Sequence, residues 1–375
     1  MRTSTIKMVI ITKNLDTDDR LIKEVETIGA PSGDTRVLAV ERDHPKGRKG
    51  VLGSGAAFHS CSDTFRPLFR PGRGIVFKAG ETLLKFMVRD ITDRRDVLWI
   101  HDPALLPYVQ WALLLRKAGW VKKVIWDLHE LPPASRLQGR WIEVTRKVLQ
   151  QLDVVVVTNA WRLSYIEEKL GVSLPHAVIL ENYPSRCAIE KPVEALPETL
   201  SDWLKGRAYF ILQGGASADR HYPTVVKACM EMNLPVVVVG KPGEVYDENL
   251  IYNTGWIPQE DVYTYIDHAA GSLIFYDQRD PNAWYCSPNR LFQAIGRGCP
   301  VLTGNNPPLK SVVEESGAGV AADTDGADTA AVKQAITQFL KAQETYRQRA
   351  AASRHRYIWE GQTQKLSEQL AGLRG

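Results

Sequence analysis

The chain has 375 residues, 44% of them hydrophobic and 24% charged, and its formal net charge is +4. These values are typical of a globular protein, and the length predicts about two domains. The five cysteines form no CxxC pair and no even-numbered framework, so we expect reduced thiols in a cytosolic protein. The one apolar run near the N-terminus, residues 8–12, has the length of a strand, which argues against a signal peptide or a spanning helix.

Short apolar runs alternate with helical patterns through the first half of the chain. The runs are nearly continuous in Val, Ile and Leu, which is typical of strands covered on both faces in a parallel sheet. The expected strands are 7–12, 35–40, 96–100, 123–128, 153–158 and 177–181, and the expected helices are 19–28, 103–117, 141–151 and 161–170.

One stretch of this half is strongly basic. Residues 42–78 carry eight Lys or Arg residues against two Asp, with Phe65, Leu68 and Phe69 interleaved, and an amphipathic pattern follows. A solvated loop before a core-facing helix is one interpretation. Attraction to an anionic membrane or to a phosphate-bearing acceptor is the other. Nucleic acid is not expected, because no recognition motif accompanies the charge.

The alternation lapses over residues 184–206, where three prolines lie among charges and indicate a linker. It then resumes with strands at 208–213, 235–239, 272–276 and 319–322, helices near 222–232, 259–268 and 307–315, and a helical tail from 328. We therefore predict two doubly wound α/β domains, 1–183 and 207–355, with residues 356–375 as a helix that packs back on the first domain. In such sheets ligands bind outside the carboxyl ends of the strands.

Three polar stretches follow predicted strands. Each has a structural explanation: Asp102-Pro103 begins a helix, His129 is half-buried, and a Gly pair makes a tight turn. Their common place at the ligand-binding edge of the two sheets favours a site instead. The stretches are His101-Asp102, His129-Glu130 and Gln213-Gly214-Gly215 with Arg220 beyond it.

Residues 285–304, YCSPNRLFQAIGRGCPVLTG, predict a short helix followed by a buried strand. Ser287 is a natural N-cap, and Pro288 suits the first helical position. Two interpretations of this helix start are open. It serves only to begin the helix, or it directs unpaired backbone N–H groups at a bound anion.

Several of these stretches are similar to one known group of enzymes. The chain resembles the GT-B glycosyltransferases, particularly glycosyltransferase family 4, in "NLDTDDRLIKEVETIGA", "HDPALLP", "VIWDLHELP", "LQGGASADR" and "SPNRLFQAIGRGCPVLTG". The resemblance implies an α/β GT-B fold, in which two doubly wound Rossmann-like domains face each other across a cleft. It also implies a nucleotide-sugar donor in the C-terminal domain, an acceptor in the N-terminal one, and a retaining transfer without a metal ion or another cofactor.

The resemblance also implies donor-side roles. Arg220 and the N–H groups at Ser287, Asn289, Arg290 and Leu291 would hold the diphosphate, unless Arg220 is paired with a neighbouring carboxylate. His129 would lie beside the transferred sugar, Gly214 and Gly215 would let the backbone approach the donor, and Trp256 and Ile257 would face the nucleobase. Tyr285 and Gln293 stand where the family carries two glutamates. Gln293 can still hydrogen-bond a ribose. Tyr285 cannot replace a carboxylate, so either Asp280 or Asn282 takes over the contact of the missing glutamate with the sugar, or the sugar is bound by other groups.

On the acceptor side, the polar residues after the first strand have two interpretations. They face the cleft, or Asp18 and Asp19 only stabilise the N-terminus of a helix. The expected acceptor-side residues are Asn14, Asp18, Asp19, His101 and Glu130, with Arg20 beside them.

The function expected from this resemblance is sugar transfer from a nucleotide sugar to a glycan, glycolipid or lipid-linked acceptor. It would take place in the cytoplasm, with peripheral contact to the inner face of an anionic membrane. A nucleotide-sugar epimerase of the same fold and a catalytically silent nucleotide-sugar-binding protein are the alternatives.

Overall fold

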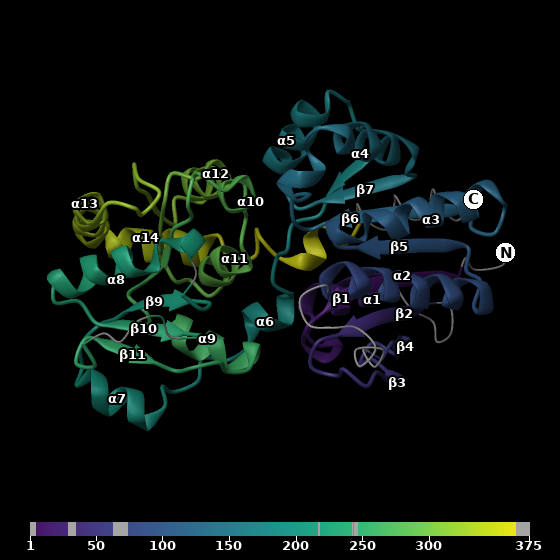
Figure 1. Cartoon of the computed structure of the whole chain (residues 1–375). Coiled ribbons are helices and arrows are strands. Elements are labelled where there is room, and N and C mark those ends of the chain that lie inside the picture. The colour runs from purple at the N-terminus through teal and green to yellow at the C-terminus, as the bar shows by residue number, and fades with distance from the viewer. Residues whose placement is uncertain are drawn as a thin grey trace. The chain divides into compact units, whose positions relative to one another are not determined.

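The computed structural model describes residues 5–28, 35–62, 74–216, 218–241, 243 and 247–364, with the backbone alone at 74–79 and 218. The chain divides into two compact units. The first comprises Met1–Leu180 with Thr363–Gly375, and the second comprises Glu181–Gln362. Each unit contains one predominantly parallel sheet covered by helices (Figure 1).

The first unit is built on a sheet with the strand order β3-β4-β2-β1-β5-β6-β7-β8. The pairs are parallel except for β3 with β4, which form an antiparallel edge of the sheet (Figure 1). The strands are β1 (Ile6–Thr12), β2 (Thr35–Glu41), β3 (Arg48–Val51), β4 (Ala57–Ser60), β5 (Val97–His101), β6 (Lys123–Leu128), β7 (Val154–Val157) and β8 (Ala177–Ile179).

The helices of this unit cover both faces of its sheet. The connection from β1 to β2 runs in the opposite direction to the later ones, so right-handed crossovers place α1 on one face and α2 to α5 on the other. Contacts join α2 to α3, α3 to α4 and α4 to α5. The helices are α1 (Asp19–Thr27), α2 (Gly74–Thr92), α3 (Leu106–Lys117), α4 (Arg140–Gln151) and α5 (Ala160–Leu170), with short 3-10 turns η1 (Leu15–Thr17), η3 (Pro103–Leu105) and η4 (Ala134–Arg136).

The second unit repeats the design with a parallel sheet of order β11-β10-β9-β12-β13-β14. Its strands are β9 (Phe210–Gln213), β10 (Val236–Val239), β11 (Ile251–Asn253), β12 (Gly271–Ile274), β13 (Val301–Thr303) and β14 (Gly319–Ala321). Its helical elements are α6 (Arg186–Glu190), α7 (Glu198–Leu204), η5 (Ala218–Arg220), α8 (Tyr222–Glu231), α9 (Gln259–Asp267), α10 (Pro281–Trp284), α11 (Asn289–Gly296), α12 (Pro307–Ser316), α13 (Thr329–Lys341), α14 (Gln343–Ala352) and η6 (Trp359–Gly361).

Strand alternation in the second unit divides its core between the two faces of the sheet. Tyr209 and Ile211 pack with residues of α7, α9, α11 and α12. Phe210 and Leu212 point the other way, to α8 and α13. Strands such as β9 and β10 are therefore apolar at consecutive positions, which explains why the sequence pattern was continuous rather than alternating.

The strands and longer helices expected from the sequence are confirmed, within one or two residues at most ends. The hairpin β3–β4, the short strand β11 and the helices α6, α7 and α10 were not predicted. They are three to seven residues long, and β3 is exposed over most of its length, so no apolar period marks them.

The expectation of a linker at 184–206 is corrected by the structure. This segment belongs to the second unit and contains α6 and α7. Leu200 and Leu204 are part of the core of that unit, and Ile189 is fully buried. The prolines and charges that indicated a linker lie between these short helices, while the apolar residues of the helices pack inward.

A buried arginine holds this segment in place. The Arg297 guanidinium donates to the carbonyls of Ala188, Ile189 and Lys191 and pairs with Asp267. Both charged side chains are almost completely buried. Arg297 therefore satisfies backbone groups of a segment that has no strand to pair with.

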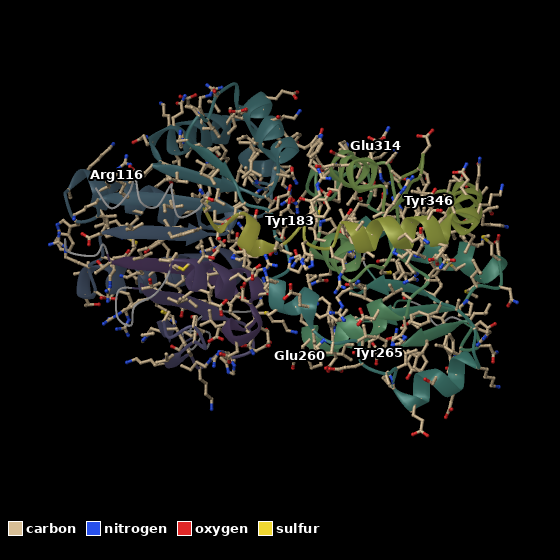
Figure 2. The ribbon with its side chains drawn as sticks, turned by 180° about the vertical axis from the view of Figure 1, so that it is seen from behind. Arg116, Tyr183, Glu260, Tyr265, Glu314 and Tyr346 are labelled. Carbon is tan, nitrogen blue, oxygen red and sulfur yellow. The ribbon has the colours of Figure 1, made fainter. Side chains whose placement is uncertain are left out.

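The tail is divided between the two units. Tyr357 packs in the core of the second unit, where its ring contacts the rings of Phe292 and Tyr183. Tyr183 is labelled in Figure 2. Gln362 exchanges hydrogen bonds with the Glu181 backbone, and Thr363 begins the part of the chain that groups with the first unit. The expected helix at 356–375 is therefore corrected in its first part, because residues 356–362 belong to the second unit and contain only the 3-10 turn η6. Residues 365–375 lie outside the described residues, so packing of the end of the tail on the first domain remains a prediction.

The basic stretch of residues 42–78 is described only in part. Arg48 is paired with Glu41 and Asp16. Arg66, Arg70 and Arg73 lie outside the described residues. None of the helices in the described ranges combines the length and the apolar character that crossing a bilayer requires.

Replacing Arg297 by Ala should lower the free energy of unfolding of the second unit by about 3–5 kcal/mol, because Asp267 is left as an uncompensated buried charge. Urea unfolding followed by tryptophan fluorescence measures this change. The control is Arg186→Ala, which removes a half-exposed i,i+4 ion pair with Glu190 and should cost less than about 1 kcal/mol. Equal effects of the two substitutions would contradict the anchoring role of Arg297.

Candidate functional site

At the carboxyl edge of the second sheet, two glycine-containing loops pack backbone against backbone. The Gly214 N–H donates to the Val239 carbonyl at 2.8 Å, and Gly240 pairs with Gly255. A Cβ on Gly240 would lie 2.8 Å from the Gly215 nitrogen. Gly214 has φ +84°, and a Cβ there would collide with the Arg220 guanidinium. These glycines therefore give Arg220 room at the end of β9.

Two arginines meet beside this loop. Arg220 Nη1 donates to the Gly215 carbonyl at 3.2 Å. Arg290 donates to the Gln213 carbonyl and to the Tyr276 hydroxyl, and its Cζ lies 4.9 Å from the centre of the Tyr276 ring. The resemblance implied diphosphate roles for both arginines, and the structure brings them together at Gly214.

The charges of this pair are not neutralised by the protein. Among the described residues, neither arginine has a carboxylate oxygen within 4.0 Å, and Arg220 Nε is buried without a hydrogen-bond partner. The alternative of a salt bridge at Arg220 is therefore not observed. Burial, and then the charge of Arg290, lower the pKa of Arg220 from its ordinary value. This neighbourhood favours the binding of an anion, which would relieve the repulsion between the two cations.

The loop that carries Arg220 is anchored by its neighbours in sequence. His221 has φ +45°, a strained value for a residue with a side chain, and its Nε2 lies 3.2 Å from an Asp325 oxygen. The Asp277 N–H donates to the Asp219 carbonyl at 2.8 Å. These contacts hold the turn η5, and with it the guanidinium of Arg220.

Helix α11 begins one residue later than the sequence indicated. Asn289 is its first residue and Pro288 stands at the N-cap position, so the expected Ser287 N-cap and Pro288 first position are wrong. Pro288 has no side-chain acceptor, and no side-chain cap satisfies the first turn. The first N–H groups of a helix have no partner within it, so the N–H groups of Asn289 and Arg290 are the donors that this beginning offers. The Leu291 N–H already donates to the Pro288 carbonyl at 3.0 Å, so its expected role as a phosphate donor is not supported. Leu291, the third residue of the helix, is completely buried.

The other donor-side residues lie on the same helical segment or on the loop after β11. Gln293 is buried on α11, and Tyr285 ends α10 as its C-cap. Trp256 is 70% exposed, with Ile257 half-buried beside it. The Asp280 side chain caps α10 by accepting from the Asn282 N–H at 3.0 Å, so this carboxylate is already engaged. Contacts of these residues with a nucleotide sugar remain a prediction.

His129 follows β6 in the first unit and remains about one third exposed. Its carbonyl accepts from Arg162, while its Nδ1 lies 4.0 Å from an Asp127 oxygen and has no hydrogen-bond partner among the described residues. The ring is therefore accessible and fixed through its backbone. The expected role beside the transferred sugar is compatible with this exposure, and remains a prediction.

Behind His129 lies a buried network that joins α1 to the sheet. Register pairs His101 of β5 with Asp127 of β6, so both side chains point to the face covered by α1. Arg20 of α1 binds Asp127 with its Nη2 at 2.9 Å and donates to the Leu180 carbonyl. Its Nε lies 2.9 Å from Glu24. The network residues are all nearly or completely buried.

The protonation states in this network follow from burial and from Arg20. Burial raises the pKa of Glu24 well above its ordinary value, against the pull of Arg20 and with support from Asp127. Burial also opposes ionisation of Asp127, but Arg20 outweighs it and lowers the pKa of that carboxyl. Burial lowers the pKa of His101 to about 3. Burial and Asp127 thus favour the protonated form of Glu24, Arg20 favours the carboxylate form of Asp127, and His101 is neutral at neutral pH.

The sequence indicated that His101 lies in a polar loop, and the structure corrects this. It is the last residue of β5, it is 1% exposed and its ring stacks on that of Trp99. Its side chain therefore supports the network and does not present a surface to an acceptor. The helix-start interpretation of Asp102 is confirmed, because its side chain accepts from the Ala104 N–H.

The remaining acceptor-side residues have structural roles in this structure. Asn14 accepts from the Asp16 N–H at 2.9 Å and Asp18 from the Leu21 N–H at 3.2 Å, so both cap helical turns. Asp19 pairs with Lys23 at 2.6 Å. The helix-start alternative is thus observed. Glu130 is exposed, and contact of any of these residues with an acceptor remains a prediction.

Two groups of side chains in the described ranges place three possible metal ligands within 4.8 Å of one another. In each group an arginine already neutralises a carboxylate: Arg20 binds Asp127, and Arg279 binds Asp277. A divalent ion would have to compete with these guanidinium groups. The groups are Glu24, His101 and Asp127 in the first unit, and His221, Asp277 and Asp325 in the second.

Sequence reasoning did not find Glu24, Asp127, His221 or Asp325. Asp127 carried a signal, since it is a charged residue inside an otherwise apolar strand. Glu24 stands four residues after Arg20, which is the spacing of an ion pair on a helix. Asp325 carried no such signal, because only the fold brings the loop after β14 close to His221.

His101→Gln should flatten the dependence of stability on pH. In the unfolded chain His101 takes up a proton near its ordinary pKa of 6.5, whereas in the folded protein it stays neutral down to about 3. Wild-type stability therefore falls as the pH drops below 6.5, by up to roughly 1.4 kcal/mol per pH unit for this residue. Urea unfolding at pH 5, 6 and 7 measures the slope. An unchanged slope in His101→Gln would refute this account.

The comparisons with known proteins agree with this architecture. A family model described as glycosyl transferase-like matches residues 222–371, which lie mainly in the second unit. No curated protein matches the sequence.

Solved structures match nearly the whole chain at low sequence identity. A sucrose-phosphate synthase from Thermosynechococcus elongatus is 13% identical, with a TM-score of 0.70 and 99% of each chain covered. An α,α-trehalose 6-phosphate synthase from Burkholderia multivorans is 12% identical, with a TM-score of 0.70 and 99% of each chain covered. An E. coli structure described as trehalose-6-phosphate bound with UDP-2-fluoro glucose is 11% identical, with a TM-score of 0.70, and covers 98% of this chain and 99% of its own. The chain thus has the GT-B fold of two doubly wound α/β units, and most of its second unit matches a glycosyl transferase-like family.

Proposed function

We propose that the protein is a retaining glycosyltransferase that moves a sugar from a nucleotide-sugar donor to an acceptor. The observation that carries the proposal is the pair Arg220 and Arg290 at the carboxyl end of β9, which has no carboxylate within 4.0 Å among the described residues. The glycosyl transferase-like match over residues 222–371 covers Arg290 and begins two residues after Arg220. One similar structure is described as bound with UDP-2-fluoro glucose, which supports a nucleotide sugar as the donor.

The arginine pair fits the chemistry of sugar transfer. When the bond between the sugar and the nucleotide breaks, negative charge develops on the departing diphosphate. Two guanidinium groups held by backbone carbonyls and by Tyr276 meet this charge without reorganisation. The N–H groups of Asn289 and Arg290 at the start of α11 add donors for the same phosphates.

The transfer proceeds, in this proposal, without a metal ion or another cofactor. Divalent ions serve other phosphate-transferring sites by neutralising diphosphate charge. Here Arg220 and Arg290 supply two positive charges at one place. The proposed leaving-group charge is therefore met by side chains of the protein itself.

The remaining donor contacts follow from the resemblance to glycosyltransferase family 4. Gln293 hydrogen-bonds the ribose, Trp256 and Ile257 face the nucleobase, and Gly214 and Gly215 let the backbone approach the sugar. His129 contacts a hydroxyl of the transferred sugar. Its ring lies beside Asp127, whose position is maintained by the hydrogen bond from Arg20 in the buried network.

The acceptor is proposed to be a glycan, a glycolipid or a lipid-linked intermediate, as in polysaccharide biosynthesis. This assignment places the enzyme in the cytoplasm, in peripheral contact with the inner face of the membrane. The named neighbours include a sucrose-phosphate synthase and a trehalose 6-phosphate synthase, which makes a sugar phosphate a further acceptor class to assay.

Arg220→Ala should reduce kcat/KM for the nucleotide sugar by the equivalent of about 2–4 kcal/mol, because one preorganised cation facing the leaving diphosphate is lost. Release of nucleoside diphosphate from a panel of nucleotide sugars and acceptors measures this. A thermal-shift panel of nucleoside diphosphates should show stabilisation of the wild type that is weakened in the variant.

Arg356→Ala is the matched control, since it removes an exposed arginine that pairs with Glu315 and should leave both measurements near wild type. Nucleotide binding without turnover in the wild type would indicate a silent binding protein. Unchanged turnover in Arg220→Ala would remove this residue from the proposed role.

Gln293→Ala should raise the KM for the donor several-fold with a smaller change in kcat, because a ribose contact is made equally before and during the reaction. The comparison of ribonucleotide and 2′-deoxyribonucleotide donors is the diagnostic measurement. Wild type should discriminate against the deoxy form more strongly than the variant, and equal discrimination would argue against ribose recognition by Gln293.

A further inference from the structure

A second basic pocket lies in the first unit, away from the residues considered so far. It has a volume of about 240 Å³ and lies between the sheet and α2. Register places Lys7, Arg36 and Ala57 at the starts of their parallel strands, whereas His101 and His129 stand at or beyond the ends of theirs. The pocket therefore opens toward the amino edge of the sheet, and the candidate site occupies the carboxyl edge.

The polar lining of the pocket comes from one face of the sheet. Arg36 and Leu38 of β2 are in register with Ala57 and His59 of β4, and Lys49 of β3 is opposite His59. Residues in register point to the same face, so these side chains converge. Helix α2 covers this face and contributes Arg89, and Asp93 directly follows the end of the helix.

Half of the positive charge in the pocket is already neutralised. Lys7 pairs with Asp90 at 3.1 Å, and Arg36 pairs with Asp93 at 3.3 Å. Lys49 and Arg89 have no ion pair within the described ranges. Burial, followed by the charges of Arg89 and Lys49, lowers the pKa of His59, so His59 is a neutral N–H donor between two cations.

We infer that this pocket binds a phosphomonoester group, with Arg89 and Lys49 as its charged contacts and His59 as a neutral donor. Two unpaired cations match the charge of nearly −2 that a phosphomonoester carries at neutral pH. The planar guanidinium of Arg89 suits two phosphate oxygens, and the ammonium of Lys49 supplies a point charge.

The ligand comes either from a soluble phosphate ester or from the headgroup of a lipid. The surroundings of the pocket bear on this choice. Val51, on the face of β3 that also carries Lys49, is 67% exposed. Leu84, Val88 and Ile91 form an exposed apolar stripe on α2, the helix that carries Arg89. Both sources present the same phosphomonoester, so the experiment is designed to separate them.

The soluble arm uses inorganic phosphate and glycerol 3-phosphate as probes, with the His59 ring resonances followed by NMR as a function of pH. Saturating phosphate should raise the pKa of His59, because the bound dianion offsets Arg89 and Lys49. Arg89→Gln should raise the same pKa without ligand. Arg89→Gln and Lys49→Gln should each weaken binding about tenfold, as expected for one charge-assisted hydrogen bond.

The lipid arm measures co-sedimentation with phosphatidylcholine vesicles that contain or lack phosphatidic acid, whose headgroup is a phosphomonoester. Binding that requires phosphatidic acid and is lost in Arg89→Gln assigns a lipid ligand. Tight binding of glycerol 3-phosphate without vesicle binding assigns a soluble one.

Lys117→Gln, which removes an exposed lysine of α3 outside the pocket, is the control for both arms. The inference is overturned if His59 does not respond to phosphate and vesicle binding is the same with and without phosphatidic acid. It is also overturned if Arg89→Gln and Lys117→Gln weaken binding equally. The Arg220→Ala variant should keep the His59 response, which separates this site from the proposed donor site.

Discussion

The proposed chemistry depends on two like charges held side by side. Arg220 and Arg290 both adjoin Gly214, and the surrounding protein offers them carbonyl oxygens and a tyrosine hydroxyl instead of carboxylates. Repulsion between neighbouring cations costs free energy, so such a pair persists only where the fold fixes both side chains. Here the glycine loops, the His221–Asp325 contact and the start of α11 fix them. The arrangement is poised for an anion in a way that a neutralised ion pair would not be.

The first unit handles charge in the opposite way. Arg20, Glu24, Asp127 and His101 are as deeply buried as core residues. The Arg20 guanidinium compensates the Asp127 carboxylate, and burial disfavours a charge on Glu24 and on His101. A buried network of this kind is costly to disturb, which makes it a rigid support. His129 stands at its edge with an accessible ring. The second unit thus carries a pair of cations without a carboxylate partner, whereas the charges of the buried network in the first unit are compensated within the protein.

Both sheets place their candidate residues by the same rule. Parallel strands end together, so residues distant in sequence collect at one edge: Asp127 and His101 in one unit, Arg220 and the Tyr276 hydroxyl in the other. The basic pocket under α2 uses the amino half of the first sheet instead. Its charges are only half compensated, which distinguishes it from the buried network on the other face.

The sequence by itself determined the fold class. Continuous apolar runs of four to seven residues between amphipathic helices require strands that are covered on both faces, and the GT-B resemblance added the doubly wound pairing of two units. It also indicated Arg220 and the glycines, because β9, the glycine turn and η5 follow one another between Phe210 and Arg220. Arg290 was indicated by a separate local pattern, the helix start of α11, and only the fold brings it to Gly214. Local patterns were insufficient where long-range packing determines the structure, as at residues 184–206. The short helices of this segment pack on the core of the second unit, and Arg297 binds its backbone carbonyls.

Only the tertiary structure decided which polar residues are exposed and which are paired. His101 and His129 look alike in sequence, as histidines at strand ends, yet one is enclosed by α1 and the other is accessible. Likewise, nothing local distinguishes Arg48, which is neutralised by Glu41, from Lys49, which is not. Charge compensation depends on contacts between segments far apart in the chain. The sequence pattern therefore specifies where strands end, whereas the assembled fold specifies which charges remain for a ligand.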